Sequence, residues 1–150
     1  MVHIQLVADQ ASLEQAKGRA LLEDDAGVLS HILFEMPVVF EIDNTPILEA
    51  PRLPIIFMAY DSLERLRNLP AKRRDRIMLP GGGSLTFTME GDQVIVSFPQ
   101  RSRTGRTAYA ELLRVWEEFS TQVKTLLVER FPELRNHPRL GAWFRGEEVI

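Results

Sequence analysis

Residues 84–98 read SLTFTMEGDQVIVSF, and this stretch decides the fold because its alternation of apolar and polar residues predicts a β-hairpin with one buried face. If Gly91 and Asp92 form a two-residue turn, every apolar residue meets an apolar partner across the hairpin. The expected pairs are Met89 with Val94, Phe87 with Val96, and Leu85 with Phe98. A slip of one residue would turn the whole set toward solvent, so the register is well specified.

A long amphipathic helix is predicted to follow, at about residues 107–131. Its apolar residues recur at a spacing of three and four: Tyr109, Leu112, Leu113, Trp116, Phe119, Val123, Leu126, Leu127 and Phe131. Thr107 is the expected N-cap. Pro132 ends the helix, because the residue before a proline is pushed out of the α region. We expect this helix to lie across the apolar face of the hairpin.

The N-terminal part of the chain predicts strands and one short helix. Residues 2–8 alternate as an opening strand with His3 on its outer side. Residues 12–15, SLEQ, fit a capping box with Ser12 as N-cap, and a short helix to about residue 23 is expected to follow. Residues 28–43 are β-rich, and residues 43–46, DNTP, predict a turn into a further strand at 47–49.

A second main helix is predicted at about residues 54–69. Pro54 suits its first turn, where a missing N–H costs nothing, and Pro70 is expected to stop it. The first half of this helix is apolar on all sides and should be deeply buried, with a strand through Phe57 as the alternative. Residues 75–79 form another candidate strand, joined to the central hairpin through Gly81, Gly82 and Gly83.

These elements predict a single α+β domain over residues 1–150, an antiparallel β meander with the two main helices (about 54–69 and 107–131) packed on one face. Ile95, Val39 and Val7 point to the other face. The N-terminal helix, the C-terminal tail or a second copy of the chain, as in a homodimer, is expected to cover it.

The composition limits the class of protein. With 150 residues, 45% of them hydrophobic, and no cysteine, the chain can bury a core without metals or disulfides, which agrees with a reducing cytoplasm. No apolar run approaches the roughly 20 residues that span a bilayer, and the start lacks the basic and apolar regions of a secretory signal. We therefore expect a cytoplasmic protein without membrane contact.

A short basic segment, RSRTGRT at residues 101–107, is the first candidate binding site. It leads straight into the N-terminus of the long helix, where free N–H groups and the helix dipole favour an anion. Arg101, Arg103, Arg106 and Thr107 would bind a phosphate, a carboxylate or an acidic partner surface there. The competing interpretation is a solvated loop, which is common for exposed arginines.

A second basic run covers residues 72–76, KRRDR, but the predicted meander places it at the opposite end from residues 101–106. Two separate basic ends, a net charge of −3 and no interleaved exposed aromatics argue against a groove for nucleic acid. Nucleic-acid binding is therefore the least favoured function.

No recognised catalytic, metal or cofactor motif occurs in the sequence. Residues 80–84, PGGGS, lack the lysine and the following helix of a phosphate-binding loop, so a bulged strand connection is favoured. The histidines, His3, His31 and His137, do not have metal-ligand spacing. Residues 23–25, EDD, indicate a solvated turn, because calcium-loop spacing is missing.

The order of elements suggests one class of function. N-terminal strands, the LPIIF helix start at 53–57, a hairpin, and a long helix ending FPEL at 131–134 before Trp143 together resemble small bacterial immunity-type proteins, which neutralise a toxin by binding it. The resemblance implies a non-catalytic domain with a protein partner. The alternative is an enzyme or regulator that binds an anionic small molecule at residues 101–107.

Overall fold

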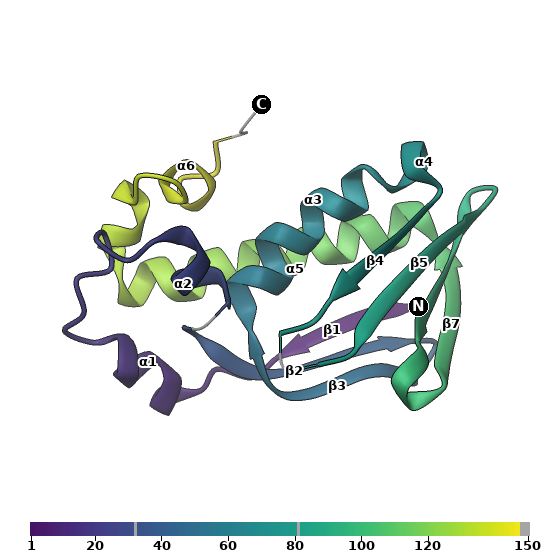
Figure 1. Ribbon diagram of the computed structural model, residues 1–150, viewed down its shortest axis with the longest axis horizontal. Helices are drawn as coiled ribbons and strands as arrows, with labels where there is room; N and C mark the ends of the chain where they lie inside the picture. The colour runs from purple at the N-terminus through teal and green to yellow at the C-terminus, as the bar shows by residue number, and fades with distance from the viewer. Residues whose placement is uncertain (32, 81, 148–150) are drawn as a thin grey trace.

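The computed structural model describes residues 1–31, 33–80 and 82–147, and it places them in two antiparallel sheets with helices packed against them (Figure 1). The first sheet contains β1 (Val2–Leu6), β2 (Glu35–Ile42) and β3 (Thr45–Pro54), in that order. The second contains β4 (Arg74–Met78), β5 (Ser84–Glu90), β6 (Gln93–Phe98) and β7 (Arg103–Ala108), also in sequence order. The predicted α+β class is confirmed, and its strands divide between two sheets.

The helical elements lie between and beyond these strands. They are α1 (Gln10–Ala16), α2 (Ala26–His31), the π-helix η1 (Phe57–Asp61), α3 (Ser62–Arg67), α4 (Leu69–Lys72), the 3₁₀-helix η2 (Pro99–Arg101), α5 (Tyr109–Arg130), the 3₁₀-helix η3 (Pro132–Asn136) and α6 (Gly141–Phe144). Figure 1 shows α5 running along the length of the molecule with α3 beside it.

The central hairpin has the predicted register. Met89 lies opposite Val94 and Phe87 opposite Val96, and all four side chains are buried. Gly91 closes the turn with a φ of +62°, a left-handed conformation that glycine adopts without steric cost. The predicted strand at residues 75–79 is confirmed as β4, the edge strand beside β5.

The first sheet is built from the predicted N-terminal strands. β1 pairs with β2 from Val2 opposite Ile42 to Leu6 opposite Val38. β2 and β3 turn through Asp43 and Asn44, whose φ values of +50° and +65° match the left-handed pair of a type I′ turn. The predicted turn is thus confirmed at Asp43 and Asn44, while residues 45 and 46 already belong to β3.

The two N-terminal helices differ from the prediction. Asp9, not Ser12, caps α1: its carboxylate accepts a hydrogen bond from Ala11 N at 3.0 Å, and Ser12 is buried. The chain is helical again at 26–31, where a β-rich segment was predicted. Asp25 begins this helix by accepting from Val28 N at 2.9 Å, so a residue assigned to a solvated turn acts as a cap.

The second main helix is interrupted. Pro54 ends β3 instead of starting the helix, and η1 is a π-helical turn that continues into α3. The helix α3 ends at Arg67, and Pro70 lies in the first turn of the next helix, α4. The C-cap of α4 is Arg73, which has a left-handed conformation. The predicted deep burial of the first half is confirmed, since the side chains from Ile55 to Ala59 are all buried.

Trp116 of α5 joins the two sheets to the π-helical turn. Its fully buried ring packs edge-on against Phe40 of β2, with centroids 5.4 Å apart, and against Phe87 of β5, at 6.1 Å. Its indole N–H donates to Met58 O at 2.8 Å. In an α-helix Ser62 N–H would bond that carbonyl, but here it bonds Phe57 O one residue earlier.

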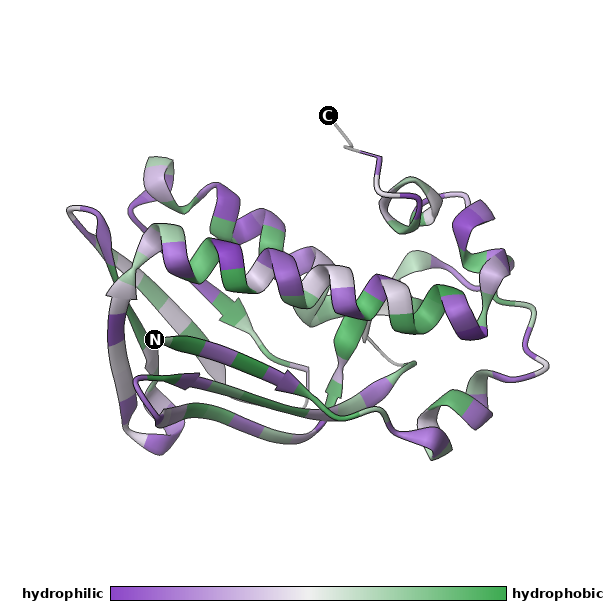
Figure 2. Cartoon of the chain, turned by 180° about the vertical axis from the view of Figure 1, so that it is seen from behind, coloured by the Kyte–Doolittle hydropathy of each residue, from purple (hydrophilic) through white to green (hydrophobic). Residues whose placement is uncertain are grey.

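The long helix is amphipathic, as predicted, and Figure 2 shows hydrophobic and hydrophilic residues alternating along it. It begins at Tyr109 with Ala108 as N-cap, so Thr107 is not the cap and instead ends up inside β7. It ends before Phe131 and Pro132, where the sequence predicted. None of the helices in the described residues combines the length and apolarity needed to cross a membrane.

The C-terminal segment packs back onto the fold through His137. This buried imidazole bonds Asp24 O through Nε2 at 2.7 Å, while Nδ1 accepts from Arg139 N and Leu140 N, each at 3.1 Å. The ring therefore fixes the turn before α6 and ties it to the connection between α1 and α2. The tail was predicted to pack as a cap, and this holds as far as residue 147, while residues 148–150 lie outside the described part.

Replacing Trp116 with phenylalanine is expected to lower the free energy of unfolding by about 2–4 kcal/mol, because the smaller ring leaves a cavity and Met58 O loses its indole donor. Urea denaturation followed by circular dichroism measures the change. Tyr109→Phe is the control, since it removes a hydroxyl that donates to Leu66 O at 2.7 Å and leaves no large cavity. An equal loss in both variants would contradict the central role of Trp116.

His137→Ala is expected to destabilise the fold by about 2–3 kcal/mol, because Asp24 O and two backbone N–H groups lose their partner in a buried site. His137→Asn should recover part of the loss, since its short amide oxygen can still accept from the backbone of the turn. Thermal unfolding of the three proteins tests this, and identical melting temperatures for alanine and asparagine would refute the turn-fixing role.

Candidate functional site

The predicted basic segment at residues 101–107 is not a loop. Arg101 ends η2, and residues 103–108 form strand β7 along the edge of the second sheet. Successive side chains of a strand point to opposite faces, so Arg103 and Arg106 lie on different sides of the sheet. The prediction of a loop is therefore wrong for residues 103–107, and Arg103 and Arg106 project from opposite faces of β7.

Two of these arginines already have carboxylate partners. Arg103 lies 3.3 Å from Glu49 of β3, and Arg106 is paired with Glu90 at the end of β5. Arg101 is exposed and has no acidic partner among the described residues. Binding of an anion at Arg101, Arg103 and Arg106 stays a prediction, but a ligand would have to compete with internal ion pairs.

The start of α5 is also occupied. Thr107 is buried, and its hydroxyl donates to Glu111 Oε2 at 3.4 Å. The other oxygen of Glu111 accepts from Val2 N at 3.1 Å. A carboxylate of the chain itself thus lies at the positive end of this helix, where a bound anion was predicted.

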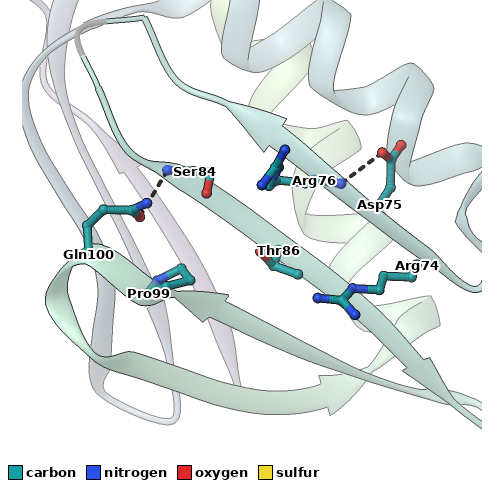
Figure 3. A pocket seen from close by; sticks show the side chains of 7 residues that line it. All are labelled: Arg74, Asp75, Arg76, Ser84, Thr86, Pro99 and Gln100. Carbon is teal, nitrogen blue, oxygen red and sulfur yellow. Dashed lines mark hydrogen bonds between the residues drawn. The ribbon is translucent and has the colours of Figure 1, made fainter.

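The other basic run, at residues 72–76, lines a hollow on the outer face of the second sheet (Figure 3). The hollow has a volume of about 540 Å³. Its lining comes from β4, β5 and η2: Arg74, Asp75, Arg76, Ser84, Thr86, Pro99 and Gln100. The expected separation of the two basic ends is wrong in part, because β7 runs back beside β6 and places Arg106 opposite Ile95, in the same row across the sheet as Arg74.

Alternation along β4 places the two guanidiniums together. Arg74 lies opposite Thr88 and Arg76 opposite Thr86, so both arginine side chains project from the outer face. Asp75 projects from the inner face, where it pairs with Arg65 of α3 at 3.2 Å and with Lys72 at 3.7 Å. Figure 3 shows its carboxylate turned away from the hollow.

The hollow is therefore cationic. Among the described residues, neither Arg74 nor Arg76 has a carboxylate within 4 Å, and both side chains are exposed. The hydroxyls of Ser84 and Thr86 add polar groups to its lining. Guanidiniums with free donors and neighbouring hydroxyls bind carboxylates or phosphates well, because both anions accept paired hydrogen bonds.

The glycine-rich connection shapes one end of this hollow. Gly83 has a φ of +84°, and a Cβ there would lie 2.7 Å from the ring of Phe98. The backbone therefore passes close under β6 and places Ser84 N 3.1 Å from Gln100 Oε1. The interpretation of this segment as a strand connection is supported for Gly82 and Gly83, and Gly81 lies outside the described residues.

Residues 72–76 are recognisable in the sequence as a basic run, but they were not predicted to be the binding site. The missed signal was the order Arg-Asp-Arg at 74–76 in an edge strand: the aspartate sits between the arginines in sequence, yet alternation sends it to the other face. Where ligands of other kinds are concerned, no three histidine, aspartate or glutamate side chains of the described residues are grouped so that they could hold a metal ion.

Comparison with protein-family models, with curated proteins and with solved structures finds no match for this chain. The function must therefore be inferred from the residues of the chain itself.

Asp75→Ala is expected to lower the free energy of unfolding by about 1–2 kcal/mol, because a half-buried carboxylate that holds Arg65, Lys72 and the Arg76 N–H at 2.8 Å is lost. Asp75→Asn should lose less, since an amide oxygen can still accept from Arg76 N. Urea denaturation measures the stabilities of the wild type and the two variants. Equal stability of the wild type and Asp75→Ala would contradict this account.

Proposed function

We propose that this chain is a non-catalytic protein-binding domain that docks an acidic segment of its partner on the outer face of the second sheet. The observation that carries the proposal is the pair Arg74 and Arg76, two guanidiniums that have no carboxylate partner among the described residues and lie on a partly exposed sheet face. Charges left unpaired on a folded surface are available to a partner, and they steer its approach and set its specificity.

The surroundings of the two arginines support a protein partner over a small molecule. The hollow is open, and the same face continues across the sheet to the half-exposed Thr88, Ile95 and Ser97. Met78 at the end of β4 is 61% exposed, which is high for a large apolar side chain. Protein interfaces commonly combine an apolar anchor residue with arginines and a polar rim, and this face has all three.

The charge of this face also argues against self-association through it. In a two-fold dimer the same patch meets itself, so the positive charge of Arg74 and Arg76 would face a patch of the same charge on the other copy. A different protein with carboxylates on its surface has no such cost. We therefore propose that a different protein covers this face. The sequence had predicted that a helix, the tail or a second copy of the chain would cover it.

The layout that resembles immunity-type proteins agrees with a dedicated protein partner and makes a toxin one candidate. The cationic hollow adds a condition to that candidate, since the docking segment of the toxin must be acidic. The product of a neighbouring gene is therefore the first partner to test.

The test compares the immobilised wild-type chain with Arg74→Glu/Arg76→Glu in pull-downs from the source organism and with the neighbouring gene product. A stoichiometric partner is expected to bind wild type and to lose affinity for the double variant by at least about 100-fold in calorimetry, since two attractive contacts become repulsive. Binding should also weaken as salt increases.

The matched control is Arg135→Glu/Arg139→Glu, which makes the same charge change at two exposed arginines in the C-terminal segment. It should bind as wild type does. Equal binding by all three proteins would refute the docking face, and repeated failure to find any stoichiometric partner with a folded bait would refute the function. Stabilisation of the wild type by inorganic phosphate alone, lost in the Arg74/Arg76 variant, would instead indicate a small anion as the ligand.

A further inference from the structure

A second site lies on the helical side of the molecule, away from the sheet face. It is a groove of about 730 Å³ between η1–α3, α5 and the segment around α6. Figure 1 shows α6 and α3 at separate places along α5, and the residues that line the groove come from all of them. Those that matter here are Tyr60, Glu64, Arg67, Glu117, Lys124 and Trp143.

Lys124 is the unusual group in this groove. Its ammonium lies 5.6 Å from the centre of the Trp143 ring, and the side chain is half-buried. Burial, and after it the neighbouring Arg67 guanidinium, lowers the pKa of Lys124 below that of an ordinary lysine. The chain has two other lysines, and each lies within 4 Å of a carboxylate: Lys17 of Glu14 and Lys72 of Asp75. Lys124 has no such partner among the described residues.

The described carboxylates around the groove do not balance this charge. Glu117 of α5 lies 3.5 Å from Arg67 of α3, and Glu147 is held by Arg145 through both of its oxygens. Glu64 of α3 is exposed to water on the side of Tyr60. Among the described residues, the charged group that acts on the pKa of Lys124 is thus another cation, Arg67.

Tyr60 supplies a neutral donor to the same groove. Burial, then Glu64 and Asp61, raises the pKa of its phenol, so the hydroxyl keeps its proton at neutral pH. Its ring packs against Trp143 with centroids 5.2 Å apart. The residue lies on the π-helical turn η1, a kind of helix irregularity that is frequent at functional sites.

We propose that this groove binds a small organic anion, with the acidic group beside Lys124 and Tyr60 and the apolar body against Trp143. The anion supplies the counter-charge that the protein withholds from Lys124. Half-buried Tyr60 and the edge of Trp143, which is 8% exposed, offer an apolar surface next to that charge, which selects an organic acid or phosphate ester over an inorganic ion. This site is independent of the proposed docking face, because it shares no lining residue with the hollow at Arg74 and Arg76.

The test uses benzoate and phenyl phosphate as probes, with inorganic phosphate as the reference, up to about 10 mM, at which a dissociation constant of about 1 mM gives about nine-tenths occupancy. Tryptophan fluorescence reports binding at Trp143, because Trp116 is fully buried. We expect at least one organic probe to change the fluorescence and to bind at least about tenfold more tightly than inorganic phosphate.

A second readout follows the lysines directly. Reductive methylation with ¹³C-formaldehyde labels three lysines, and Lys124→Arg assigns the Lys124 resonance. In the free protein the pKa of this group should lie below that of an ordinary lysine, and saturation with the organic probe should raise it. No change at Lys124 in the presence of the probes would overturn the proposal.

Substitutions locate the site. Lys124→Met is expected to weaken binding at least about tenfold, Tyr60→Phe to weaken it less, and Lys17→Met to leave it unchanged, with circular dichroism confirming that each variant folds. Equal binding by wild type and Lys124→Met, or equal affinity for inorganic phosphate and phenyl phosphate, would refute the assignment.

Discussion

The packing of Trp116 is the interaction on which the two sheets depend, because one side chain touches both of them. Its ring contacts Phe40 in the first sheet and Phe87 in the second, while its N–H holds the π-helical turn through Met58 O. Either sheet alone is a few strands with one apolar face, and such sheets are marginal in water. The long helix therefore acts as the shared core element, and both sheets take their positions from it.

Local patterns of the sequence predicted most of the elements but not their grouping. The hairpin at residues 84–98 and the helix around Trp116 could be recognised because alternation and helical spacing act over a few neighbours. The division into two sheets depends on contacts between strands that are distant in sequence. One such contact joins Gly105 of β7 to Ile42 of β2, where a Cβ added to the glycine would lie 3.0 Å from the isoleucine side chain. A glycine in a basic segment carries no signal of that approach, so β7 was taken for a loop.

The ion pairs of the candidate site could not be predicted either, because they too join residues that are distant in sequence. Counting charges along the chain made residues 101–107 the strongest basic segment, although Glu49 and Glu90 neutralise two of its arginines from other strands. The run at 72–76 contains an aspartate and appeared weaker. The pleat of β4 separates Asp75 from Arg74 and Arg76 and leaves the two arginines on one face, without a carboxylate partner in the described part of the chain.

Two long-range hydrogen bonds join the N-terminal part of the chain to its C-terminal half. Val2 is bound to Glu111, and Asp24 to His137, across 109 and 113 residues. During synthesis the N-terminal strands can pair early, but the bond to Val2 waits for the start of α5 and the bond to Asp24 waits for the turn before α6. Until α5 has left the ribosome the nascent chain presents the apolar side of β1 and β2 without its cover, so a helix that is made late protects the strands that are made first.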